Sequence, residues 1–145
     1  MSPINQYVVF KLNKENYGVP IEHVETVEKL TEITRVPNAP HYINGVMNLR
    51  GEVIPVMDLR KRFDLEHIST TDDSRIIVLS LDEISVGILT DSCSEVIALD
   101  KGQIDKTYNL TIPLEDDYVE GIGKLNERMI IILDIPKLLI NNMDT

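Results

Sequence analysis

The sequence predicts a mainly β fold in which two repeated units each form a small, closed or nearly closed barrel with a short helix. Three observations lead to this prediction: the chain repeats itself internally, each copy contains two hairpin patterns, and each copy ends in a short helix that follows an aspartate. Short strands with frequent turns favour barrels, because closure of a sheet removes its exposed edges.

The internal repeat has two parts. Residues 7–27 align without a gap on residues 76–96, which lie 69 positions later, and residues 45–59 align on residues 121–135, which lie 76 positions later. A repeat decides the architecture and is therefore examined before other signals. Positions that agree between the copies are expected to serve the fold, and positions that differ are free to serve function.

The first copy begins with a hairpin pattern. Residues 7–12 and 17–21 are β-branched or aromatic runs around a turn at residues 13–16. The next stretch, residues 22–29, has Val24 and Val27 three positions apart among glutamates, which fits either a helical turn or an irregular strand.

A second hairpin and a capped helix complete each copy. Residues 46–49 and 53–57 form strand patterns around Arg50 and Gly51. Asp58 and Asp134 each precede a short helical segment, where a carboxylate caps the first backbone N–H groups, so capping is favoured over catalysis for both.

The second copy opens with a hairpin from residues 75–81 and 84–89, after a polar link at residues 69–74. We therefore expect a first unit over residues 1–72 and a second over residues 73–145. Units of about 70 residues lie near the lower size limit for an independent core, so they are expected to pack on each other or exchange strands.

Composition excludes several classes of function. The 145-residue chain has a net charge of −10, which argues against nucleic acid and against an anionic membrane surface as partners. A single cysteine, Cys93, rules out an internal disulfide framework; it aligns with Val24 and is expected to be a small buried residue. The longest apolar run, residues 129–133, is too short to cross a bilayer, and no signal peptide is recognised, so a cytosolic protein is expected.

No residue pattern predicts catalysis, a cofactor or a metal. The glycines Gly121 and Gly123 lack the third glycine and the strand-to-helix setting of a phosphate-binding loop. His23 has only neighbouring glutamates as possible co-ligands, and the acidic run at residues 115–117 is interpreted as a solvated loop rather than a calcium site.

The tip of the second hairpin differs between the copies. Asn48 and Arg50 correspond to Lys124 and Asn126, so the fold does not require the first pair. Two interpretations of Arg50 remain open: it forms a surface ion pair of little energetic consequence, or a glutamate holds it at a site for a partner.

Residues 33–40 (ITRVPNAP) and 45–60 (GVMNLRGEVIPVMDLR) strongly resemble the CheW family of bacterial chemotaxis adaptors. The resemblance continues through residues 17–19, 91–96 and 121–139 and so covers nearly the whole chain in order. It implies two intertwined five-stranded barrels of OB or SH3-like type, with short helices and with strands exchanged between barrels, which makes the boundary near residue 72 approximate.

The resemblance also implies a function. A CheW-like protein is a non-catalytic adaptor that couples the cytoplasmic tip of methyl-accepting chemotaxis receptors to the histidine kinase CheA. The first barrel is expected to meet the regulatory domain of CheA, and the groove between the barrels to accept the helical hairpin tip of the receptor. The protein would be cytoplasmic, without direct insertion in the membrane, and associated with membrane receptor arrays through its partners.

Candidate site residues follow from the same resemblance and, for Val27, from its repeat equivalence with Val96. Four residues are expected to bind the receptor: Val24, Val27, Arg50 and Val96. Four are expected to bind the kinase: Gly45, Val46, Asn48 and Leu49. Where some members of the family have a glutamate that holds the arginine, this chain has Thr26, and the sequence leaves open whether Glu25 or Glu28 takes that place.

Two other functions compete with this interpretation. One is a CheW-like module of another two-component signalling scaffold. The other is an OB-type ligand-binding domain, which usually binds single strands through basic and aromatic surface. The chain has no Trp, two Phe and an acidic balance, which disfavour such a domain.

Replacement of Arg50 by alanine tests whether this arginine serves function rather than fold. The melting temperature of Arg50→Ala is expected to stay within about 2 °C of that of the wild type, because the repeat counterpart is Asn126. Signalling assembly with receptor and kinase is expected to weaken. A large fall in melting temperature would instead make Arg50 a residue of the fold.

Overall fold

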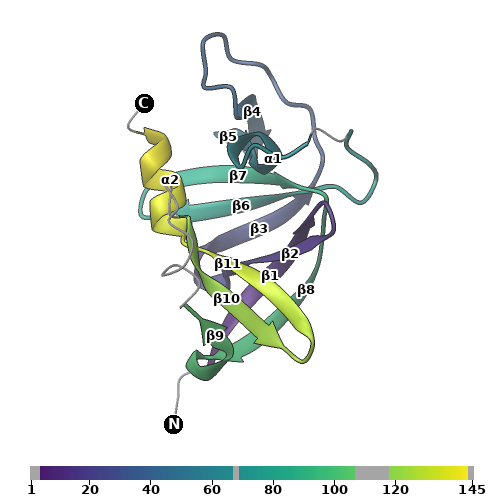
Figure 1. The fold of residues 1–145 in the computed structure, drawn as a ribbon. Coiled ribbons are helices and arrows are strands. Elements are labelled where there is room, and N and C mark those ends of the chain that lie inside the picture. The colour runs from purple at the N-terminus through teal and green to yellow at the C-terminus, as the bar shows by residue number, and fades with distance from the viewer. Residues whose placement is uncertain (1–3, 67–68, 107–117, 144–145) are drawn as a thin grey trace. The chain divides into compact units, whose positions relative to one another are not determined.

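The computed structural model describes residues 4–66, 69–106 and 118–143 of the chain. Within these ranges the chain forms two β-sheets and a few short helices (Figure 1), and the predicted mainly β class is confirmed. The acidic run at residues 115–117 lies outside the described residues.

The chain divides into two compact units that do not follow its consecutive halves. Unit 1 comprises Met1–His23 together with Ser94–Thr145, and unit 2 comprises Val24–Cys93. Unit 2 is therefore continuous in sequence and is inserted between the two segments of unit 1.

The first sheet has six strands in the order β8-β1-β2-β11-β10-β9. The strands are β1 Ile4–Leu12, β2 Glu15–Pro20, β8 Ser92–Asp100, β9 Ile104–Asp105, β10 Val119–Leu125 and β11 Arg128–Leu133. The accompanying helical elements are the 3-10 turns η1 (Ile21–His23) and η2 (Lys101–Gln103) and the helix α2 (Ile135–Met143). β8 and β9 lie at opposite edges but are joined by η2 alone. A flat sheet would separate these edges by about 24 Å, whereas the connection spans at most about 14 Å, so the sheet must curl.

The second sheet has five strands in the order β3-β6-β7-β5-β4. Their bounds are β3 Val24–Lys29, β4 Ile43–Leu49, β5 Glu52–Asp58, β6 Arg75–Leu81 and β7 Ile84–Thr90, and helix α1 spans Leu59–Arg62. Outside the named strands, Thr34 and Val46 form an isolated bridge in which each backbone N–H donates to the other's carbonyl at 2.8 Å.

Each sheet combines a hairpin from one copy of the repeat with a hairpin from the other. β2 pairs in parallel with β11, where Gly18 lies opposite Ile132, and β7 pairs in parallel with β5, where Gly87 lies opposite Val56. These two pairs are equivalent by the repeat, so the register is the same in both sheets. The strands are thus exchanged reciprocally between the copies.

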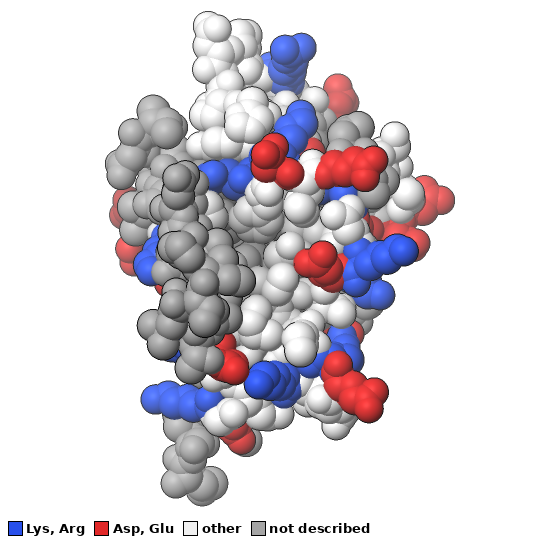
Figure 2. Space-filling model, viewed as in Figure 1, with Lys and Arg blue, Asp and Glu red and all other residues white. Residues whose placement is uncertain are grey.

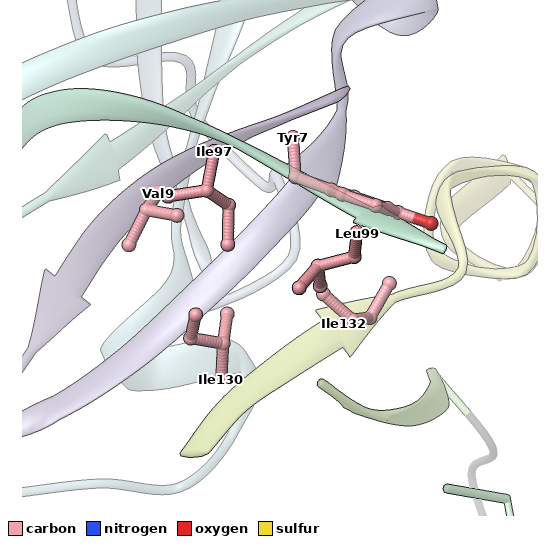
Figure 3. Packing of buried hydrophobic residues seen from close by; sticks show 6 residues of the cluster. All are labelled: Tyr7, Val9, Ile97, Leu99, Ile130 and Ile132. Atoms are coloured by element: carbon pink, nitrogen blue, oxygen red, sulfur yellow. The ribbon is translucent and has the colours of Figure 1, made fainter. Parts of the chain in front are cut away.

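Two clusters of buried side chains form the cores. In the first sheet, Tyr7 and Val9 of β1, Ile97 and Leu99 of β8, and Ile130 and Ile132 of β11 point toward a common centre (Figure 3). In the second sheet the cluster consists of Met47, Ile54, Val56, Ile76 and Val78. A side chain added at Gly18 would lie 3.1 Å from the Ile132 Cδ1 atom, so the core packs directly on the glycine backbone.

Several local predictions hold with changes in their bounds. The first turn is shorter than predicted, because β2 already begins at Glu15. Residues 22–29 contain both predicted alternatives, since η1 ends at His23 and the irregular strand β3 follows. The Asp58 Oδ1 atom accepts a hydrogen bond from the Arg60 N–H at 3.0 Å, and that of Asp134 accepts from the Lys137 N–H at 3.0 Å, so both predicted caps are confirmed.

Gly45 marks the point where the backbone of β4 meets the segment that contains Thr34. Its φ is 152°, and a Cβ atom there would overlap the Thr34 carbonyl oxygen. The register of β4 against β5 shifts between Ile43 and Gly45, and the equivalent shift occurs between Val119 and Gly121. Gly45 is therefore fixed by close backbone approach.

Gly45→Ala is expected to lower the free energy of unfolding by about 3 kcal/mol, because its Cβ meets backbone that cannot move aside. Gly51→Ala is the matched control: its φ is 89°, but nothing lies within 4 Å of an added Cβ. The control is expected to cost about 1 kcal/mol for the left-handed conformation alone. Urea denaturation measures both, and equal losses would contradict the close approach at Gly45.

Candidate interaction surfaces

The β4–β5 hairpin has a two-residue turn that fixes which side chains share a face. Arg50 and Gly51 have φ values of 52° and 89°, as in a type I′ turn, whose twist matches that of the flanking strands. Leu49 therefore pairs with Glu52, Asn48 with Val53, and Val46 with Pro55. Directly paired residues point to the same face of the sheet.

The outward face of this hairpin carries four residues: Val46, Asn48, Val53 and Pro55. We call these residues the β4–β5 patch. Val53 is 69% exposed, although its type is usually buried. Val46 and Asn48 were predicted from the sequence, whereas Val53 and Pro55 were not. The two-residue turn was the available signal, because it sets the register of the strands.

The other two residues predicted to bind the kinase face inward. Gly45 is buried against the Thr34 segment, and Leu49 packs against the core cluster of the second sheet. The structure gives both a role in the fold, and their contact with a kinase remains a prediction.

Arg50 lies at the hairpin tip, exposed to solvent. Neither Glu25 nor Glu28 forms an ion pair with it in the described parts of the chain, where the Thr26 hydroxyl donates to the Glu28 Oε2 atom at 2.6 Å. The positive φ of Arg50 belongs to the type I′ turn and recurs at its repeat counterpart Asn126, whose φ is 57°.

Val24 and Val27 lie together on one face of the edge strand β3. A bulge between Val24 and Thr26 shifts the register, so that Val24 pairs with Leu79 and Val27 with Ile77. Val27 is 40% exposed, whereas Leu79 and Ile77 are fully buried. The two valines thus extend an apolar row to the sheet edge.

Val96, the fourth residue expected to bind the receptor, lies on β8, an edge strand of the first sheet, and is 52% exposed. It is the repeat equivalent of Val27, so both copies expose a valine on an edge strand. Of the predicted receptor residues, Val24 and Val27 share one face, whereas Arg50 and Val96 belong to other elements.

Next to Val96, Glu95 forms a two-pronged ion pair with Arg128. The Arg128 Nη1 and Nη2 atoms donate to the two Glu95 carboxylate oxygens at 2.9 and 2.8 Å. The hydrogen bond from Arg128 lowers the pKa of Glu95 below its ordinary value, while partial burial acts in the opposite direction. Both carboxylate oxygens are therefore held by the guanidinium. The sequence analysis did not single out this pair.

A cavity of about 320 Å³ lies beside α1 in unit 2. Its lining includes Arg60, which is 5% exposed and donates from Nε to the Asp91 Oδ1 atom at 2.9 Å and from Nη1 to the Glu66 carbonyl at 2.8 Å. With these partners, the buried Arg60 guanidinium holds α1 against the end of β7. Arg60 and Asp91 both belong to the segments that resemble the CheW family, and their ion pair gives them a structural role.

Cys93 is partly exposed rather than fully buried as expected. Burial nevertheless raises the pKa of its thiol, and the charge of Arg75 only partly offsets this effect. A thiol with a raised pKa is a weak nucleophile at neutral pH. The residue therefore behaves as a small packing residue near the start of β8.

The distribution of charge and of possible metal ligands was compared over the described residues. On the face shown in Figure 2, acidic and basic side chains are interspersed rather than gathered by sign. Among the described residues, no three His, Cys, Asp or Glu side chains group in a way that could hold a metal ion. None of the helices within residues 4–66, 69–106 and 118–143 combines the length and apolar character needed to span a membrane.

Comparison with known proteins identifies the family. The family model of the CheW-like domain matches residues 6–142. The chemotaxis protein CheW of Klebsiella aerogenes is 37% identical over 92% of this chain and 81% of its own length. That of Bacillus subtilis is 36% identical over 91% of this chain and 85% of its own length.

A solved structure agrees with this result. The crystal structure of the scaffolding protein TtCheW from Thermoanaerobacter tengcongensis superimposes with a TM-score of 0.82 at 37% identity. The superposition covers 93% of this chain and 87% of the TtCheW chain. Sequence and fold therefore agree over nearly the whole chain. From these matches we conclude that the chain belongs to the CheW-like family.

Proposed function

We propose that this chain is a chemotaxis coupling adaptor that binds the regulatory domain of a CheA-type histidine kinase and the cytoplasmic tip of methyl-accepting chemotaxis receptors. The observation that carries the proposal is membership of the CheW-like family over residues 6–142, with relatives that are named chemotaxis proteins. The structure adds exposed apolar residues at separate places in the fold, which suit a protein with two partners.

The kinase is assigned to the β4–β5 patch. Val46, Asn48, Val53 and Pro55 form a contiguous outward face on a hairpin whose register is fixed by its turn. A face on a hairpin of fixed register suits another β domain, because little ordering entropy is lost when neither partner changes its backbone conformation. Gly45 and Leu49 support this face from behind, and their own contact with the kinase stays a prediction.

The receptor tip is assigned to the edge-strand valines and to Arg50. Val24, Val27 and Val96 are aliphatic anchors of the kind that an amphipathic helix needs. Arg50 adds a rigid fork of hydrogen-bond donors. Because neither Glu25 nor Glu28 occupies its guanidinium, a carboxylate of the partner is the group that it fits.

The proposal includes no catalytic step, cofactor or metal. The chain acts by holding two other proteins together, and its place is the cytoplasm, at membrane receptor arrays that it joins through those partners. Affinity then depends on a few desolvated apolar anchors rather than on the total contact area.

Val53→Ser is expected to weaken binding to the isolated regulatory domain of CheA about tenfold in titration calorimetry, because burial of one valine contributes about 1.5 kcal/mol. Its melting temperature should stay near that of the wild type, since the side chain is 69% exposed. Affinity for the receptor tip should not change.

Met129→Ser is the matched control for this prediction. Met129 is the repeat equivalent of Val53 on the other hairpin and is 67% exposed. Its affinity for the kinase domain should remain within about twofold of the wild type. An equal loss in both variants would refute the assignment to the β4–β5 patch, and no binding of the wild type to either partner would refute the adaptor function itself.

A further inference from the structure

The Glu95–Arg128 ion pair closes one end of the core of the first sheet. Glu95 lies two and four positions before Ile97 and Leu99 on β8, and Arg128 lies two and four positions before Ile130 and Ile132 on β11. Side chains two apart on a strand share a face. Both charged groups therefore point to the same side as the core cluster in Figure 3.

The pair also spans the sheet. β1 and β2 lie between β8 and β11 in the strand order, so two strands separate the backbones that carry the two charges. The two hydrogen bonds, of 2.9 and 2.8 Å, thus connect the edge strand β8 to the β10–β11 hairpin across the curled sheet. Among the described strands, β8 pairs on one side only, with β1.

The second sheet has no such tie at the equivalent place. The repeat counterparts of Glu95 and Arg128 are Thr26 and Glu52, which share the inner face with the core of that sheet. Thr26 donates to Glu28 on its own strand, and within residues 24–66 and 69–93 no ion pair joins β3 to β5. The two cores share several equivalent positions, but the described parts of the sheets differ in how their edge strands are held.

We propose that Glu95 and Arg128 are positioning residues that hold β8 in place and thereby present Val96 to the receptor tip. This inference rests on the proposed function, because it takes Val96 as a receptor contact. Glu95 immediately precedes Val96, and the two side chains point to opposite faces of β8, with Val96 52% exposed. A strand held by its inward side chain loses less entropy when its outward side chain is bound.

The ion pair acts locally rather than on overall stability. The side chains of Arg128 and Glu95 are 37% and 38% exposed, and pairs with such access to water contribute little to unfolding free energy. Loss of the pair should therefore leave the global transition almost unchanged but loosen β8. Edge strands open by local fluctuations that hydrogen exchange detects.

The test compares hydrogen exchange of residues 92–100 in the full-length wild type, in Glu95→Gln, and in the charge-reversed double variant Glu95→Arg/Arg128→Glu. Exchange in this segment should be about threefold faster or more in Glu95→Gln and should return toward the wild-type rate in the double variant. Glu25→Gln, which removes an exposed carboxylate from the edge strand of the other sheet, is the matched control and should not change it.

Binding to the receptor tip completes the test. Affinity should fall about threefold in Glu95→Gln and recover in the double variant, while the melting temperature shifts by less than about 4 °C. An unchanged hydrogen-exchange rate of residues 92–100 in Glu95→Gln would overturn the inference, whether or not the affinity for the receptor tip changes. Wild-type affinity of a Val96→Ser variant would instead overturn the receptor assignment of the proposed function, while the exchange measurement would still decide whether the pair holds β8.

Discussion

The structure depends on two parallel strand pairs that have the same register. β2 lies against β11 and β7 against β5, with a glycine opposite a buried β-branched residue in each pair. Each pair joins a hairpin from one copy of the repeat to a hairpin from the other, so that each copy completes a sheet of the other. Because a half-chain of about 70 residues has little core of its own, this exchange is what allows two small cores to form in one chain.

The exchange also separates the residues that build the fold from those that are free to differ. Several inward positions match between the copies, as Val56 matches Ile132, Ile54 matches Ile130 and Gly87 matches Gly18. Some outward positions keep their exposure but change their chemistry, as Asn48 and Lys124 do. In the adaptor account such positions are free to serve partners, whereas the Glu95–Arg128 pair is a difference on the inner face.

Sequence reasoning recovered what depends on local pattern. The hairpins, the aspartate caps and the mainly β class follow from alternation and turn chemistry, which act over a few residues. It could not decide which hairpin pairs with which, because the two copies have similar apolar faces and either partner satisfies the pattern. The small size of the units left packing and strand exchange as alternatives, and the family resemblance supplied the expectation of exchange.

The candidate surfaces were predictable only in part. Val27 and Val96 stood out through the repeat, and their exposure suits the contacts proposed for them. Val53 and Pro55 were missed because their side of the hairpin becomes clear only once the turn has set the register. The Glu95–Arg128 pair was out of reach, since the curl of the sheet brings together residues that lie 33 positions apart.

The most direct measurement of the central claim is calorimetric titration of the full-length chain with a receptor tip, with and without a saturating concentration of the CheA regulatory domain. An adaptor that bridges two proteins must bind both at once. The account predicts a complex with one copy of each component and a receptor affinity that the kinase domain changes by no more than about twofold. Loss of receptor binding in the presence of the kinase domain would show that both partners compete for one surface and would contradict the account.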